Sequence, residues 1–87
     1  MAIRRRDGVS FEPSGDTVVI LDADGTVMTT LNPVGAAIWQ ELDGRRDAAA
    51  LAKDLVRRFD GVSVEELEAD ITTFVESLLE SKLVELD

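Results

Sequence analysis

The sequence predicts a single small α+β domain in which short antiparallel strands come first and helices follow. The chain has 87 residues, the size of one small domain. The spacing of its apolar residues changes near residue 32 from an alternating to a helical pattern. Apolar residues make up 45% of the chain and charged residues 31%, a mixture typical of a folded domain rather than a disordered segment.

The part of the chain before residue 32 predicts three short strands joined by tight turns. A weak strand over residues 9–12 is followed by turn-forming residues. A stronger strand over residues 17–21 has β-branched side chains at four of its five positions. The residues at 22–25 favour a tight turn, and residues 26–31 form the returning strand. Short strands with short connections pair most simply as an antiparallel meander.

The part after residue 32 predicts three helices with clear start signals. Asn32 is a suitable N-cap for the first helix, and Pro33 fits its first turn, where a missing N–H costs nothing. Asp47 caps a second helix, and Ser63 opens a capping box for a third and longest one. Residues 83–86 form either a short terminal strand or a docked tail. Three helices beside a small sheet indicate a winged helix-turn-helix-like architecture.

The side-chain inventory excludes most catalytic chemistry. The chain has no cysteine and no histidine, so disulfides, thiolate zinc sites, histidine bases and Cys or Ser triads are excluded. Asp22 and Asp24 resemble the opening of a calcium loop, but its twelfth position is Pro33, so we interpret them as turn residues. We assign Trp39 to the core, with a ligand-stacking residue as the alternative. We therefore expect no enzyme activity, no metal and no cofactor.

The net charge of −9 argues against binding to nucleic acid or to an anionic membrane. The third predicted helix carries six carboxylates, which would oppose a DNA backbone. A small winged helix-turn-helix DNA-binding transcriptional regulator remains the alternative function. The basic residues near the second helix are a possible docking face for an acidic partner protein, and this point stays open: Arg45, Arg46, Lys53, Arg57 and Arg58. The longest apolar run is five residues, over 48–52, far too short for a membrane span or a signal segment, so a cytoplasmic location is expected.

The strand predicted over residues 26–31 contains no proline, lysine or other charged residue, the features that usually protect an exposed sheet edge. If this strand is an edge, its backbone can accept an added peptide strand. The alternatives are an interior or covered strand, or a dimer formed through this edge.

Four stretches of the chain resemble the PqqD family. Residues 31–44 are similar to its signature LN-x-x-(G/A)-A-x-I-W…L-x-G, which here is Leu31-Asn32-Pro33-Val34-Gly35-Ala36-Ala37-Ile38-Trp39 and Leu42-Asp43-Gly44. The strand at residues 18–22, the helix at 51–60 and the ending at 70–84 also match its pattern. The resemblance covers about residues 9–86. This sequence departs from the family at Met28, where an aromatic is usual, and at Lys82, where glycine is common.

The resemblance implies a standalone RiPP recognition element, a domain that binds the leader of a ribosomally made precursor peptide. The leader would add as an antiparallel strand to the third strand and lie against the third helix. The residues that this implies for peptide binding are Thr26, Val27, Met28, Thr29, Thr30, Leu31, Asp70, Ile71, Phe74, Val75 and Ser77. The expected organisation is a flexible N-terminus over residues 1–8 and a single PqqD-like domain over residues 9–87.

The partners implied by the resemblance are the precursor peptide and a separate modifying enzyme. That enzyme is a radical-SAM maturase, as in pyrroloquinoline quinone synthesis, or a lasso-type leader peptidase, and the sequence does not decide between them. We expect a monomer or a weak homodimer. The acidic third helix beside the groove favours a neutral or basic leader.

Overall fold

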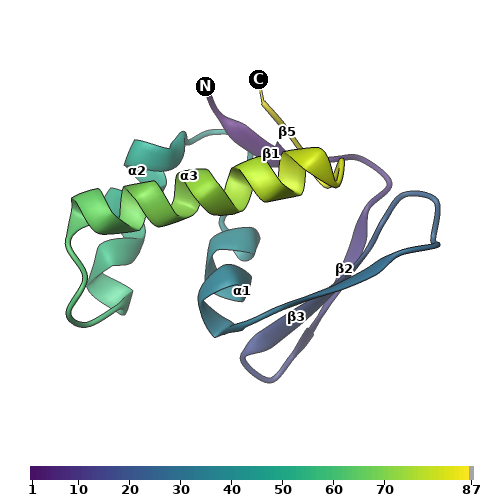
Figure 1. Ribbon diagram of the computed structural model, residues 1–87, viewed down its shortest axis with the longest axis horizontal. Helices are drawn as coiled ribbons and strands as arrows, with labels where there is room; N and C mark the ends of the chain where they lie inside the picture. Colours follow the sequence, from purple (N-terminus) through teal and green to yellow (C-terminus); the bar gives the residue numbers. More distant parts are fainter. Residues whose placement is uncertain (87) are drawn as a thin grey trace.

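The computed structural model describes residues 1–86, which form two antiparallel sheets and three α-helices (Figure 1). The elements in chain order are β1 (Ile3–Arg5), β2 (Ser10–Ser14), β3 (Thr17–Leu21), β4 (Met28–Leu31), α1 (Pro33–Gln40), α2 (Ala48–Leu55), the 3₁₀ helix η1 (Val56–Arg58), α3 (Val64–Glu80) and β5 (Val84–Leu86). The α+β, winged helix-turn-helix-like fold expected from the sequence is confirmed, and the structure adds a second sheet made of β1 and β5.

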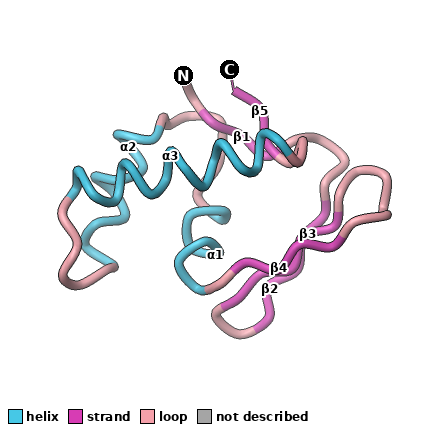
Figure 2. The backbone as a smooth tube through the Cα atoms, in the orientation of Figure 1, coloured by secondary structure: helices cyan, strands magenta, loops and turns pink. Residues whose placement is uncertain are grey.

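The three-stranded sheet has the order β2-β3-β4, with β3 in the centre. Alternation along β3 places Val18 and Ile20 on the face toward the helices, where both are fully buried. Leu31 of β4 lies opposite Val18 and is buried on the same face. The sheet extends away from the helices at one side of the molecule (Figure 2).

Each α-helix begins with the side-chain cap that the sequence predicts. Asn32 accepts a hydrogen bond from the Gly35 N–H at 2.8 Å, and Asp47 accepts one from the Ala50 N–H at 2.9 Å. The Ser63 hydroxyl oxygen accepts one from the N–H three residues later at 3.1 Å. These bonds satisfy N–H groups that have no partner within the helix.

Helix α1 lies between α3 and the three-stranded sheet (Figure 1), and Trp39 at its end is the largest fully buried side chain. The assignment of Trp39 to the core is therefore confirmed. Phe11 of β2 packs edge-on against its ring at a centroid distance of 5.7 Å. The Arg5 guanidinium lies 5.0 Å from the Phe11 ring and donates to the Trp39 carbonyl at 2.9 Å, so β1, β2 and α1 meet at this point.

The structure differs from the flexible N-terminus expected for residues 1–8. Strand β1 pairs with β5, and Ile3 is buried. The N–H of Ile3 donates to the Arg46 carbonyl at 3.0 Å, and its carbonyl accepts from the Gly44 N–H at 2.9 Å. The strand escapes sequence analysis because three apolar residues followed by three arginines show no alternation. Of the two alternatives for residues 83–86, the terminal strand is the correct one.

Within residues 1–86, none of the helices combines the length and the apolar character needed to cross a membrane.

Candidate functional site

Strand β4 is one edge of the three-stranded sheet, because no strand of residues 1–86 pairs with its second side. It contains no proline and no charged residue. The opposite edge, β2, carries Pro13 and Glu12, and proline removes a backbone donor there. The two edges therefore differ, and β4 is the one suited to accept another strand.

The register identifies which backbone groups of β4 face the open side. In an antiparallel ladder, pairs that exchange hydrogen bonds alternate with pairs whose N–H and C=O groups point outward. The Asp22 N–H donates to the Val27 carbonyl at 3.1 Å, so this pair is of the first kind. Counting along the pairing with β3, Met28 and Thr30 present their N–H and C=O groups to the open edge. Thr29 and Leu31 instead direct their N–H and C=O groups toward β3.

The sequence predicts a strand over residues 26–31, but in the structure β4 begins two residues later, at Met28, and residues 26 and 27 belong to the preceding turn. The carboxylate of Asp22 accepts hydrogen bonds from the N–H groups of Thr26 at 2.9 Å and Val27 at 3.3 Å, and from the Thr26 hydroxyl at 3.3 Å. These two N–H groups are consequently not available to an added peptide. The interpretation of Asp22 as a turn residue is confirmed, and its side chain fixes where the open edge begins.

The same hydrogen bonds, above all the one from the Thr26 N–H, hold the pKa of Asp22 below its usual range. Because the pKa of Asp22 is lower in the folded state than in the unfolded state, its ionised carboxylate stabilises the turn at pH values above the unfolded-state pKa. This stabilisation is lost as the pH falls through the lowered pKa of the folded state.

We expect Asp22→Ala to increase amide hydrogen exchange at Thr26 and Val27 at neutral pH, because both N–H groups lose their acceptor. Asp22→Asn is the matched control, since its amide oxygen can still accept from both groups. In the unsubstituted chain the protection should fall at acidic pH, whereas in Asp22→Asn it should not depend on this titration. Equal exchange in Asp22→Ala and the unsubstituted chain would contradict the role given to this carboxylate.

A groove of about 450 Å³ lies between the end of β4, the start of α1 and helix α3. It is lined by Thr30, Leu31, Asn32, Val34, Gly35, Ile38, Asp70 and Phe74. A Cβ atom added to Gly35 would lie 3.3 Å from Cε1 of Phe74, so glycine allows α1 to approach α3 here. Val34 is 44% exposed, so one wall of the groove is an uncovered apolar surface.

The structure brings together only some of the residues implied for α3. Asp70 and Phe74 line the groove beside β4. Ile71 and Val75 are buried in the core, and Val75 borders a separate hollow on the other flank of α3. Ser77 is exposed, and its hydroxyl donates to the Phe74 carbonyl at 2.7 Å. Helical spacing explains the difference, since residues 70 and 74 share a face that residues 71 and 75 do not.

Sequence reasoning missed the contribution of α1 to the groove. Val34 and Ile38 belong to the apolar pattern of that helix, and such a pattern by itself indicates packing in the core. The available signal was Gly35 at the start of a helix, where glycine is unfavourable unless another chain segment approaches closely.

The lining of the groove and the strands of the three-stranded sheet contain no lysine or arginine. Among residues 1–86, Asp70 is the only charged residue that lines the groove. No lysine or arginine occurs between residues 7 and 44, a span that holds all of β2, β3, β4 and α1. The carboxylates of α3 are Glu65, Glu66, Glu68, Asp70, Glu76 and Glu80.

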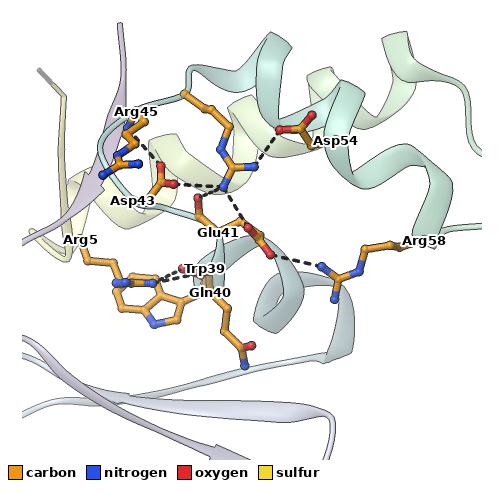
Figure 3. Close-up of polar contacts among 9 residues, drawn as sticks. Arg5, Trp39, Gln40, Glu41, Asp43, Arg45, Asp54 and Arg58 are labelled. Atoms are coloured by element: carbon orange, nitrogen blue, oxygen red, sulfur yellow. Dashed lines mark hydrogen bonds and ion pairs between the residues drawn. The ribbon is translucent and has the colours of Figure 1, made fainter.

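Two of the basic residues near α2, Arg46 and Arg58, are engaged in ion pairs with carboxylates of this chain (Figure 3). Arg46 donates to Glu41 at 2.9 Å and to Asp54 at 2.8 Å, and it also pairs with Asp43 at 3.4 Å. The hydrogen bonds to Glu41 and then Asp54 raise the pKa of Arg46. Arg58 shares Glu41 at 3.4 Å. These bonds connect the end of α1 to α2 and η1, so two of the five basic residues have an internal structural role.

Comparison with known proteins finds the same family along most of the chain. The family model described as "Coenzyme PQQ synthesis protein D (PqqD)" matches residues 17–84. A PqqA binding protein from Pseudomonas paraeruginosa is 39% identical over 74 residues, covering 85% of this chain and 76% of the relative. One from Stutzerimonas stutzeri is 33% identical over 85 residues, covering 98% and 88%.

Two solved structures share the fold. A lasso peptide synthetase B1 complexed with the leader peptide has a TM-score of 0.82 and 27% identity, covering 98% of this chain and 99% of that chain. TbiB1 in complex with the TbiA(beta) leader peptide has a TM-score of 0.84 and 23% identity, covering 94% of each chain. The sequence match and the shared fold together place the chain in the PqqD family.

Proposed function

We propose that this protein is a RiPP recognition element that binds the leader of a precursor peptide as an added strand on β4. The observation that carries this function is the open, unprotected edge of β4 beside an apolar groove. The relatives bind PqqA, and one solved neighbour of similar length is complexed with a leader peptide. These relatives are peptide-binding proteins, which supports a binding role for this chain rather than a catalytic one.

The geometry supports a specific binding mode. The leader backbone pairs with the outward-facing groups of Met28 and Thr30. Leader side chains that lie opposite Leu31 point to the helix side of the sheet, where Phe74 and Val34 line the groove. Main-chain hydrogen bonds supply affinity that depends little on sequence, and the groove sets the register.

The charge distribution supports a neutral or basic leader. Asp70 lies in the groove, the strands β2, β3 and β4 contain no lysine or arginine, and α3 carries six carboxylates. A basic leader would therefore bind more weakly as the salt concentration rises.

The chain presents the bound leader to a separate modifying enzyme, either a radical-SAM maturase or a leader peptidase. The alternative function of a DNA-binding regulator is not supported. The relatives of this chain are peptide-binding proteins, and α3 carries six carboxylates that would repel a DNA backbone. Arg46 and Arg58 are engaged in ion pairs within the chain.

The test is an NMR titration of the labelled full chain with the leader of the precursor encoded beside its gene. We expect amide shift changes at Met28, Thr30 and Phe74, because these residues border the proposed site. A DNA duplex of mixed sequence is the comparison ligand and should change none of them. Leader shifts confined to other elements would refute strand addition, and saturable DNA shifts on α2 and α3 would support the regulator instead.

A further inference from the structure

The outer face of the three-stranded sheet, which points away from the helices, carries an uncovered apolar stripe. Val19 and Leu21 of β3 are half-buried there, and Met28 of β4, directly opposite Leu21, is 70% exposed. Together with Ser10, Phe11 and Glu12 they line a hollow of about 250 Å³. No segment of residues 1–86 covers this outer face, which is unusual for an apolar strand surface.

A bound leader would extend this stripe. Residues that lie directly opposite one another in an antiparallel pair point to the same face of the sheet. The leader residue opposite Met28 would therefore stand beside Met28 on the outer face, whereas its neighbours would enter the groove on the helix side. The stripe of Val19, Leu21 and Met28 would then continue onto the leader as one surface, which exists in full only when the leader is bound.

The charge around the stripe restricts what can cover it. Glu12 lines the hollow, and the neighbouring turns add Asp16, Asp22 and Asp24. The strands and turns of this sheet contain no basic residue, and the Arg5 guanidinium lies against the ring of Phe11, 5.0 Å from its centroid. A second copy of this chain would bring the same negative charges against them, so self-association through this face is opposed. A partner surface with an apolar centre and a basic rim fits instead.

We infer that the stripe of Val19, Leu21 and Met28, extended by the outward side chains of the bound leader, is the docking surface for the modifying enzyme. This inference rests on the proposed leader binding to β4. The enzyme is then expected to carry a complementary surface patch with an apolar centre and a basic rim. It also means that the enzyme distinguishes the loaded protein from the empty one by contacting both chains at once.

The experiment measures two affinities with the full chain, the labelled leader and the modifying enzyme encoded in the same gene cluster. The first is the affinity of the leader for the protein, and the second is that of the enzyme for the protein–leader complex, both by fluorescence anisotropy. We expect the double variant Val19→Thr/Leu21→Thr to keep the leader affinity within about twofold and to weaken enzyme binding roughly tenfold or more. Threonine keeps the β propensity of the central strand.

Two further variants make the result specific. Leu86→Thr removes an exposed apolar side chain from the other sheet and should change neither affinity. Glu12→Lys lies on an exposed strand outside the core and should weaken enzyme binding while leaving leader binding intact. If the double variant fails to fold, the enzyme and leader affinities of Glu12→Lys provide the test of the docking surface.

The outcomes separate the inference from the proposed function. Unchanged enzyme binding in the stripe variants, or an equal loss of leader affinity, would overturn the docking surface while leaving leader binding in place. Concentration-dependent dimerisation that the stripe variants abolish would assign the stripe to a second copy and overturn it too. A leader that does not bind the unsubstituted protein would overturn the proposed function and, with it, this inference.

Discussion

Thr30→Pro is expected to weaken leader binding by at least about tenfold, because it removes an N–H that faces the open edge of β4 and puts the proline ring in the path of the added strand. The fold should tolerate this change, since the Thr30 N–H takes no part in the pairing with β3. Pro13 occupies an outward-facing position of the same kind on the other edge strand. The measurement is a titration of labelled leader into each variant, with circular dichroism to verify folding.

Thr30→Val is the matched control, because it keeps both the backbone N–H and the branched β-carbon. It should bind the leader nearly as well as the unsubstituted protein. Thr29→Pro gives the converse result, since it removes an N–H directed at β3 and should lower the stability of the sheet itself. Full leader affinity in a folded Thr30→Pro protein would show that the edge of β4 is not where the leader pairs.

The register determines which substitution of β4 tests strand addition. A uniform strand over residues 26–31 makes every N–H of the strand an equal candidate for pairing. The side chain of Asp22 changes this, because it takes the N–H groups of Thr26 and Val27. A proline at Val27 would therefore perturb the turn rather than the edge. Alternation of apolar residues locates a strand, but which of its donors face outward depends on pairing and turn geometry.

The strands and helices with strong local signals were predictable from the sequence. The three N-caps, the β-branched strand β3 and the missing protection of β4 all depend on residues close together in the chain. Strand β1 was not predictable, because Ile3 becomes buried only through pairing with β5 at the other end of the chain. The same limit applies to the groove, whose α1 wall depends on how closely Gly35 lets α3 approach.

Trp39→Ala is expected to lower the free energy of unfolding by about 3–5 kcal/mol, the usual cost of replacing a buried large aromatic side chain by alanine. Trp39 is fully buried, and its loss removes the contact with Phe11 and leaves a cavity between the sheet and α1. An 87-residue domain lies near the lower end of the usual unfolding free energies of about 5–15 kcal/mol, so this loss should remove most of its stability. Urea denaturation followed by circular dichroism measures the change without relying on the fluorescence of the tryptophan that is removed.

Trp39→Phe is the informative comparison, because it separates the packing of the ring from its polar atom. The indole Nε1 of Trp39 is buried and has no hydrogen-bond partner among residues 1–86. A buried donor without a partner costs about 1–3 kcal/mol, and phenylalanine removes this cost together with part of the ring volume. Trp39→Phe should therefore destabilise the protein much less than Trp39→Ala. It should also bind the leader normally, since α1 stays in place and continues to supply Val34 and Ile38 to the groove. Equal destabilisation by both variants would mean that Nε1 contributes a favourable interaction in solution.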